Sequence, residues 1–529
     1  MDNRDMIKSV RAYREKLLCD PYRPLYHFAA PDDDGRPGDP NGCFYAGGLH
    51  HLMYLYRRNG GAFHWGHVSS HDLLHWRHYP DSLAKGPADE GCFSGGAFVD
   101  DDGTAYLTYW IFNEGDKTDG RNAGIGLAKS RPPYENWERL PDAVIRSTRW
   151  GIRDDSIGSI GCADPGNIWK DGGKYYVQLG NLCVLNAYGR APDSPADMRG
   201  DWTELFSSDD LHEWKYEGRF YSRRADNAWT DETEDNMCPS YLPLPSSRWG
   251  GAPSGKMLEL FIAHNKGCQY YIGRREGLRF IPESHGRMSW NDNAFFAPEA
   301  YIDDGGRQIM FAWLLDNLEN DFEKYGWSGV YGLPRSLWLR GDGTLGIAPV
   351  GETENLRFNE RVHAVGTDVL DIGRPDCCEI SAAFTLIGAV GAGVTGVTAE
   401  EDVMPDCSNG GDNPSAAFKA GVRVESGAYC AELYFSSREN ALVMDLTKSG
   451  SPVRAIRESA PLTLDDREDL RLRVFVDRSV LEIFANDRQA ISRRVYFPNP
   501  DDIRISLIRE GAAAVTDARS WELAATNPY

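Results

Sequence analysis

Five stretches of alternating apolar and polar residues follow glycine-rich turns in the first two thirds of the chain. They span residues 48–57, 103–110, 172–180, 255–264 and 305–314. A turn followed by β-branched or aromatic alternation is typical of a β-hairpin. The copies recur at intervals of about 50–80 residues, enough for one four-stranded sheet each. The pattern therefore predicts five radially packed sheets, a five-bladed β-propeller. A β-sandwich with the same turns is the alternative.

A second repeat supports the propeller. The segment SSHDLLHW at 69–76 resembles SSDDLHEW at 207–214, with weaker copies at 129–137 and 274–280. Each copy follows a strand-like stretch, as expected when one structural unit is repeated.

A short strand precedes each of the five alternating stretches. These inner strands span 39–44, 93–98, 164–169, 238–242 and 297–301. The first strand of each propeller blade lines the central channel, so residues at corresponding strand ends converge at one mouth. Asp39 and Asp164 occupy equivalent positions in two of these strands. The repeat therefore predicts two carboxylates in one pocket.

After the propeller repeat ends, the chain alternates again in short strands typical of a β-sandwich. The predicted strands span 379–386, 416–424, 430–436, 441–445, 470–476, 480–484 and 503–508. We expect an all-β protein with a propeller domain over 1–345, a linker over 346–365 that is helical at 352–357, and a sandwich domain over 366–529. Two further predictions are an amphipathic helix at 1–20 and a long surface loop at 388–415.

Composition excludes several classes of partner. The formal net charge of −22 repels nucleic acid and anionic lipid. The chain has no run of 18 apolar residues and no apolar segment of a signal peptide, so we expect neither a membrane partner nor secretion. The chain has 11 cysteines, an adjacent pair at 377–378 and nine scattered ones, which suits reduced thiols in the cytoplasm. Neither zinc-type Cys/His spacing nor a phosphate-binding loop is present, so no metal and no cofactor are expected.

Paired carboxylates at a channel mouth suit the cleavage of glycosidic bonds. Retention of configuration needs a nucleophile and a proton donor about 5–5.5 Å apart, against about 6.5–9.5 Å for inversion. Asp39 and Asp164 supply two acidic groups, and a third is expected before the fourth inner strand, in the acidic run 231–235. Glu234 is the predicted proton donor because it is the Glu closest to that strand. Each segment alone is more often a turn or a solvated loop; their joint position in the repeat favours catalysis.

The same region of each blade supplies candidate sugar contacts. Aromatic rings stack on the CH groups of sugars, although most Trp residues in strands only pack in the core. The predicted substrate-binding residues are Arg36, Asn41, Trp65, Phe93, Ser94, Asp235 and Trp313. Trp110 and Trp327 are further aromatic candidates, and His27, His64 and His67 are interpreted as structural. No G-x-S-x-G motif supports a serine nucleophile.

Several motifs occur in the order found in one enzyme family. They are LYHF at 25–28, DPNG at 39–42, WGHVS at 65–69, FSG at 93–95, ADP at 163–165, CP at 238–239, FAP at 296–298, GLPR at 332–335, RVFVDRS at 473–479, LEIF at 481–484 and RVYFP at 494–498. With these motifs in this order, the chain resembles glycoside hydrolase family 32, the invertases, inulinases and levanases. The resemblance implies a five-bladed propeller joined to a β-sandwich, retaining chemistry, and no metal. It also implies Asp39 as the nucleophile and Asp164 as the stabiliser of the transition state.

The chain differs from the family pattern at several positions that usually contact the sugar. Arg36-Pro37-Gly38 stands where the family has Trp-Met-Asn, Leu55 where it has Gln, and Ala163 where it has Arg. The acid/base Glu of the family directly precedes the Cys, where this chain has Met237, so Glu234 would be a shifted version of that residue. Either Arg36 and other residues replace the missing sugar contacts, or the sugar differs.

The predicted function is retaining hydrolysis of β-fructofuranosides, such as sucrose, fructo-oligosaccharides or fructans. The substrate is thus a small molecule or an oligosaccharide, and the sandwich is the expected contact surface of a homo-oligomer. Three alternatives remain open. They are a fructosyltransferase, including one that forms difructose anhydride, a glycosidase for another furanoside, and a non-catalytic sugar-binding propeller.

Overall fold

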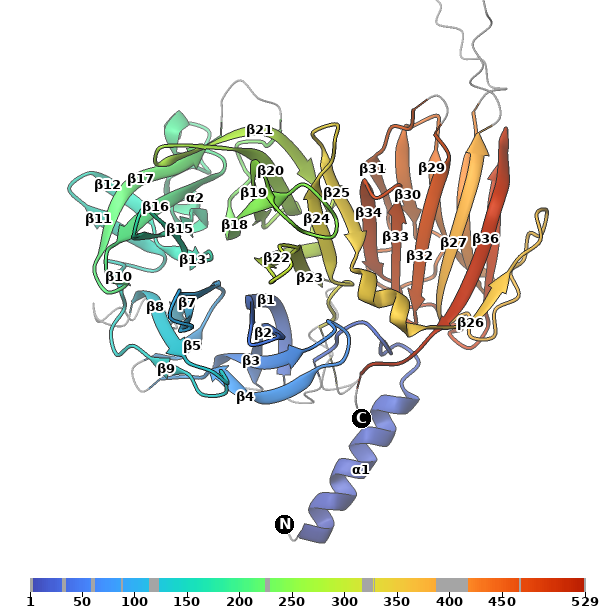
Figure 1. The fold of residues 1–529 in the computed structure, drawn as a ribbon, viewed down its shortest axis with the longest axis horizontal. Helices are drawn as coiled ribbons and strands as arrows, with labels where there is room; N and C mark the ends of the chain where they lie inside the picture. The colour runs from blue at the N-terminus through green and yellow to red at the C-terminus, as the bar shows by residue number, and fades with distance from the viewer. Residues whose placement is uncertain are drawn as a thin grey trace, which may run out of the picture.

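The computed structural model describes most of the chain as two β-domains that lie side by side (Figure 1). The described residues are 3–30, 35–58, 62–86, 89–113, 123–223, 229–315, 327, 329–386, 417–465 and 468–527, with the backbone alone at 35–37, 58 and 386. The predicted loop at 388–415 and the side chain of Arg36 lie outside the described part.

The first domain is the predicted five-bladed propeller; the strands within each blade are antiparallel, and a parallel pairing of Phe63 with Gly91 links the first two blades. Blade 1 consists of β1 (Gly35–Ala46), β2 (Leu49–Arg58), β3 (Phe63–Ser70) and β4 (Arg77–Leu83). Blade 2 consists of β5 (Gly91–Cys92), β6 (Ala97–Val99), β7 (Ala105–Phe112), β8 (Gly124–Ser130), β9 (Glu138–Arg139) and β10 (Ile145–Arg146). Blade 3 consists of β13 (Ala163–Pro165), β14 (Trp169–Asp171), β15 (Lys174–Gly180), β16 (Trp202–Ser208) and β17 (Trp214–Ser222). In these three blades the glycine-rich turns at 48, 103 and 172 directly precede β2, β7 and β15, as the alternation predicts.

The last two blades follow the same order. Blade 4 consists of β18 (Met237–Pro245), β19 (Pro253–Ala263), β20 (Gly267–Glu276) and β21 (Arg279–Arg287). Blade 5 consists of β22 (Phe295–Ile302), β23 (Gln308–Leu314), β24 (Arg335–Leu339) and β25 (Leu345–Pro349). Together the five inner strands surround the central channel (Figure 1).

The inner strands of blades 3, 4 and 5 share an irregularity at the channel mouth. Each shifts register at an X-Pro step, and the residue before the proline has a left-handed backbone. These residues are Asp164 (φ 37°), Cys238 (φ 49°) and Ala297 (φ 47°). A β-bulge re-aims the side chain that it carries, and left-handed non-glycine residues cluster at functional sites because they cost free energy. The bulges of blades 3 and 4 bring the side chains of Asp164 and Cys238 together.

The second domain is a sandwich of two antiparallel sheets, as predicted. The six-stranded sheet contains, in spatial order, β26 (Arg357–Val362), β36 (Ala513–Leu523), β27 (Cys377–Leu386), β32 (Leu470–Asp477), β33 (Val480–Ala485) and β34 (Gln489–Arg494). The five-stranded sheet contains β31 (Arg457–Pro461), β30 (Ala441–Asp445), β29 (Tyr429–Ser436), β28 (Lys419–Ser426) and β35 (Ile503–Glu510). Alternate residues of both sheets, among them Val422, Leu433, Val474 and Ile483, form one buried core.

Half of the range predicted as a linker, 346–365, belongs to strands of the two domains. Its first residues belong to β25, which pairs with β24 of blade 5, and β26 pairs with β36 of the sandwich. Only the 3-10 helix η4 (Gly351–Leu356) separates these strands. The domains therefore meet within a few residues, because a strand on each side of the predicted boundary completes a sheet.

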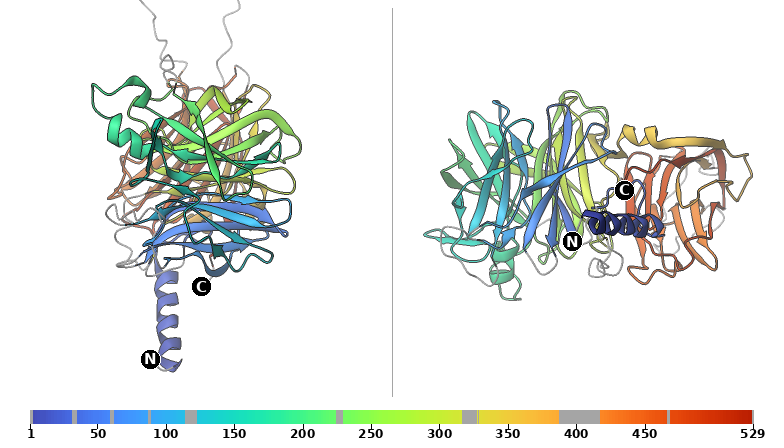
Figure 2. Two further views of the ribbon diagram at one scale, coloured as in Figure 1. Left: turned by 90° about the vertical axis from the view of Figure 1, so that its left-hand side faces the viewer. Right: turned by 90° about the horizontal axis from the view of Figure 1, so that it is seen from below.

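Helices are few and lie outside the sheets. Helix α1 (Asn3–Cys19) extends away from the body near the junction of the domains, and Leu17 is its one buried residue (Figures 1 and 2). Helix α2 (Leu182–Tyr188) and the 3-10 helix η2 (Ala196–Met198) lie between β15 and β16, and the hairpin of β11 (Ile152–Asp155) and β12 (Gly158–Gly161) precedes blade 3. No helix in the described part is long and apolar enough to cross a membrane.

Candidate functional site

Side chains from four blades meet at the channel mouth. Asp39 comes from β1, Ser94 from the segment between β5 and β6, Asp164 from β13 and Cys238 from β18. The Ser94 hydroxyl donates to Asp39 Oδ2 at 2.5 Å. The Cys238 Sγ lies 3.8 Å from Asp39 Oδ2 and 3.5 Å from Asp164 Oδ2. The two carboxylates thus flank one thiol, although 125 positions separate them in the sequence.

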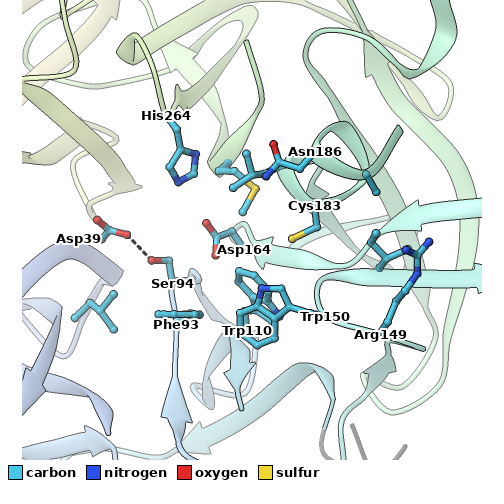
Figure 3. Close-up of a pocket in the computed structure, with 15 residues that line it drawn as sticks. Asp39, Phe93, Ser94, Trp110, Arg149, Trp150, Asp164, Cys183, Asn186 and His264 are labelled. Atoms are coloured by element: carbon cyan, nitrogen blue, oxygen red, sulfur yellow. Dashed lines mark hydrogen bonds between the residues drawn. The ribbon is translucent and has the colours of Figure 1, made fainter. Parts of the chain in front are cut away.

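These groups open into a pocket of about 710 Å³, a volume typical of a site for a small ligand. One wall is aromatic: the Trp110 ring centroid lies 5.3 Å from that of Phe93 and 4.2 Å from that of Trp150 (Figure 3). The full lining is Asp39, Leu55, Phe93, Ser94, Trp110, Arg149, Trp150, Ile152, Asp164, Leu182, Cys183, Asn186, Ala187, Met237 and His264. Flat apolar rings beside two acids suit a sugar ring that stacks on one face and reacts on another.

Burial raises the pKa of both carboxyl groups above the ordinary value of an aspartate. Asp164 is only 7% exposed. Its burial, together with the nearby negative charge of Asp39, raises the pKa of Asp164 to about 7. Burial also raises the pKa of Asp39, while the hydrogen bond from Ser94 and the charge of His264 oppose that rise. Burial and the two neighbouring acids raise the pKa of the Cys238 thiol well above its usual range, so the thiol stays protonated beside them.

A histidine held by a buried aspartate completes the pocket. His264 Nδ1 lies 2.8 Å from Asp235 Oδ2, and the backbone N–H of His264 donates to Asp235 Oδ1 at 3.1 Å. Asp235 is fully buried, whereas the His264 side chain is 46% exposed. Partial burial disfavours the charged ring, but the hydrogen bond to Asp235 and the charges of the three acids outweigh it and raise the pKa of His264.

The structure does not bring the predicted proton donor, Glu234, into this pocket. The buried Glu234 carboxylate accepts hydrogen bonds from Arg287 at 2.7 and 2.9 Å and from Gln269 at 2.9 Å. A turn closed by the bond from Glu234 N to Asp231 O directs the side chain toward the sheet of blade 4. Glu234 is thus a structural ion-pair partner, and we withdraw its assignment as proton donor.

Three predicted sugar contacts hold strands together instead of lining the pocket. The buried Asn41 amide oxygen accepts the Gly95 N–H at 3.2 Å, which ties blade 1 to blade 2. Trp65 is completely buried, and its indole N–H donates to the Phe93 carbonyl at 3.1 Å. Trp313 packs edge-on against Phe296, with ring centroids 6.2 Å apart. Phe93 and Ser94 do line the pocket, and Asp235 reaches it only through His264.

Sequence reasoning missed one whole wall of the pocket. Leu182, Cys183, Asn186 and Ala187 come from α2, and the segment 149–152 lies beside them. A signal was present: about 20 residues separate the hairpin strands β15 and β16, with apolar residues at helical spacing ended by a glycine. His264 was also missed, although it directly follows the second strand of blade 4.

Comparison with known proteins gives a consistent result over the whole chain. The profile of the glycosyl hydrolases family 32 N-terminal domain matches residues 27–349, and that of the C-terminal domain matches residues 353–522. A sucrose-6-phosphate hydrolase of Zymomonas mobilis is 27% identical over 546 residues, which cover 99% of this chain and 97% of that protein. A levanase of Bacillus subtilis is 25% identical over 525 residues, covering 90% of this chain and 67% of the levanase. The crystal structure of fructan 1-exohydrolase IIa from Cichorium intybus has the same fold, with a TM-score of 0.76 at 22% identity over 96% of this chain and 98% of that one.

Proposed function

The chain belongs to the glycosyl hydrolases of family 32, and on this premise we propose that it hydrolyses β-fructofuranosides with retention of configuration. The observation that carries the proposal is the meeting of Asp39 and Asp164, from two blades, around one thiol in an aromatic pocket. Relatives named for the hydrolysis of sucrose 6-phosphate, levan and fructan support this substrate class. We expect sucrose, fructo-oligosaccharides or fructans as substrates.

In the proposed reaction, Asp39 attacks the anomeric carbon and Asp164 stabilises the charge that develops on the ring. The Ser94 hydrogen bond favours the anionic form of Asp39, which a nucleophile requires. A carboxylate beside the ring lowers the energy of an oxocarbenium-like transition state more than that of the neutral sugar. The positive charge on the ring also favours the anionic form of Asp164 and so opposes the burial that raises the pKa of this carboxyl group to about 7.

The polar side chains of the pocket differ from those that the family resemblance implies. Leu55 lines the pocket where a Gln is usual, and Ala163 precedes Asp164 where an Arg is usual. Polar groups stand instead on the α2 side, where Arg149 is fixed by Asp154 at 3.0 Å and Asn186 faces the pocket (Figure 3). Because unpaired buried hydroxyls cost about 1–3 kcal/mol each, we propose that Arg149 and Asn186 bind sugar hydroxyls.

Replacement of the proposed nucleophile tests the function. Asp39→Asn keeps the size of the side chain but removes its charge, so we expect kcat to fall by about 10³-fold or more with the fold intact. The assay follows free fructose from sucrose, inulin and levan, and circular dichroism checks the fold. Activity close to that of the unchanged protein would contradict the proposal.

One observation favours a second candidate, a propeller that binds sugars without cleaving them. Met237 lines the pocket where the family resemblance places the acid/base Glu. A protein of this kind would bind fructans in a calorimeter while releasing no fructose from any of the three substrates. Fructose release that Asp39→Asn abolishes would exclude it.

Two further properties remain proposals. We propose a cytoplasmic location, which is supported by the free thiols of all ten cysteines in the described part of the chain. We also propose a homo-oligomer that associates through the sandwich, and light scattering on the purified protein tests it.

A further inference from the structure

The proposed hydrolysis lacks an evident proton donor. A sugar alkoxide is a poor leaving group, so the bridging oxygen must receive a proton as its bond breaks. Among the described residues that line the pocket, the only carboxyl groups are Asp39 and Asp164. Glu234 is bound to Arg287, and Met237 carries no proton to give.

We propose that His264, held by Asp235, is the catalytic acid and base of this enzyme. The inference rests on the proposed function and names the group that completes its reaction. His264 is the one imidazole in the lining of the pocket.

The strand register explains how His264 reaches this position. Strands β18 and β19 are antiparallel, and Met237 pairs with Ile262. Two residues farther along this ladder, Asp235 stands opposite His264, which accounts for the two hydrogen bonds between them. The imidazole therefore extends from the strand next to Met237, the position of the acid/base Glu in the family resemblance.

The hydrogen bonds orient the ring for proton transfer. Asp235 binds Nδ1, which leaves Nε2 for the pocket, and the ring extends toward the space between Asp39 and Asp164 (Figure 3). The Phe296 ring packs edge-on at 5.8 Å, and Asn293 donates to the His264 carbonyl at 2.8 Å. A base fixed by a carboxylate on its other nitrogen is the arrangement that general acid–base catalysis requires.

The surrounding charges favour a protonated ring. Asp235, Asp39 and Asp164 raise the pKa of His264, and their effect exceeds the opposing effect of burial. Arg190 brings a positive charge to the same pair, with its Nη2 3.8 Å from Asp235 Oδ1. The imidazolium thus persists to a higher pH than in water, as suits a proton donor.

Each step balances. Asp39 forms a bond to the anomeric carbon while the bond from that carbon to the bridging oxygen breaks, and the proton of His264 Nε2 passes to that oxygen. The neutral imidazole then takes a proton from water, the water oxygen bonds to the anomeric carbon, and the bond to Asp39 breaks. The histidine and the carboxylate return to their first state, and one water has been consumed.

Two variants test the proton transfer. His264→Ala removes the ring, and His264→Gln keeps a group able to bond Asp235 but unable to transfer a proton. We expect both to lower kcat on sucrose by about 10²–10⁴-fold and to lose the decline in rate at alkaline pH. With 4-nitrophenyl β-D-fructofuranoside, whose leaving group needs no proton, we expect a burst of about one equivalent of nitrophenolate, and azide should restore turnover as fructosyl azide.

The chain offers a matched control in another Asp–His pair. His75 Nδ1 lies 2.8 Å from Asp72 Oδ2 on the exposed edge of blade 1, outside the pocket. His75→Ala should leave kcat and the pH profile unchanged. Met237→Glu combined with His264→Ala should recover activity on sucrose, because it installs a carboxylic acid at the family position.

The outcomes separate this inference from the proposed function. If Asp39→Asn abolishes both activities while the His264 variants keep rates within threefold of the parent and the same pH profile, the inference is overturned and the function stands. If Asp39→Asn still releases nitrophenolate at the parental rate, the proposed function is wrong, and the role of His264 falls with it.

Discussion

The hydroxyl of Ser94 is the strongest single contact of the proposed nucleophile. It donates to Asp39 Oδ2 at 2.5 Å, and it lowers a pKa that burial otherwise raises. A nucleophilic carboxylate must be anionic, so the ionisation of Asp39, together with that of Asp164, makes the rate rise with pH. Ser94 thus extends the working range of the enzyme toward acid.

Ser94→Ala should shift that range. Removal of the hydrogen bond raises the pKa of Asp39 further, so the acidic limb of the kcat profile moves to higher pH. At pH values on that limb, we expect kcat to fall by about tenfold, as for the loss of a bond to a charged group. The measurement is sucrose hydrolysis between pH 4 and 8. Ser82→Ala is the control, because the buried Ser82 hydroxyl bonds the Trp65 carbonyl, and neither residue lines the pocket. An unchanged acidic limb in Ser94→Ala would be inconsistent with this role.

At the scale of elements, the alternation of the strands was sufficient to predict five blades and the sandwich. The equivalence of Asp39 and Asp164 was visible as well, because an X-Pro step recurs at the mouth end of four inner strands. The direction in which a single side chain points was not visible in the sequence. The run 231–235 places two adjacent acids on opposite sides, Glu234 toward Arg287 and Asp235 toward His264, and a tight turn rather than any periodicity decides this.

Helix α2 shows the other limit of a strand-based prediction. It is an insertion within one hairpin of blade 3, too short to change the repeat, yet it forms the wall of the pocket that carries Asn186. Its end is fixed by contact between Gly189 and η2. A Cβ atom at Gly189 would lie 2.0 Å from the Met198 carbonyl oxygen.

Gly189→Ala should therefore displace α2. The backbone must move to relieve the contact, so we expect KM for sucrose to rise several-fold and the protein to lose about 1–3 kcal/mol of stability, with a smaller change in kcat. Steady-state kinetics and denaturant unfolding measure both. Gly341→Ala is the matched control, since no atom lies within 4 Å of a Cβ there. Equal KM values for the two variants would show that α2 does not shape the site.

At the scale of the whole molecule, the two domains are joined by buried charge. His27, which precedes the first blade, lies 2.9 Å from Asp477 and 3.1 Å from Glu482 of the sandwich. Asp477 also accepts the backbone N–H groups of residues 25–27, and Glu482 accepts that of Leu333. Sequence motifs near both ends of the chain and at the end of the propeller thus meet in one network, which ties the propeller rigidly to the sandwich.

This junction should make the free energy of unfolding fall as the pH rises. Burial disfavours a charged His27, but the hydrogen bonds and charges of Asp477 and Glu482 prevail and raise its pKa from 6.5 to about 9. A group whose pKa is raised on folding stabilises fully below its unfolded pKa and loses this contribution as pH rises through the folded value. We therefore expect His27 to contribute up to about 3 kcal/mol below pH 6.5 that disappears between pH 6.5 and 9.

Urea unfolding at pH 6, 7.5 and 9 measures this dependence in the parent protein and in His27→Gln. The variant should be less stable at pH 6 and should show a flatter profile, because glutamine binds the same carboxylates without a titrating charge. His71→Gln, at an exposed histidine whose ring bonds the Gly48 carbonyl, should keep the parental profile. Parallel profiles for the parent and His27→Gln would mean that the domains are held by apolar contacts such as those of Phe475 and Phe484 with the propeller core, and not by this charge.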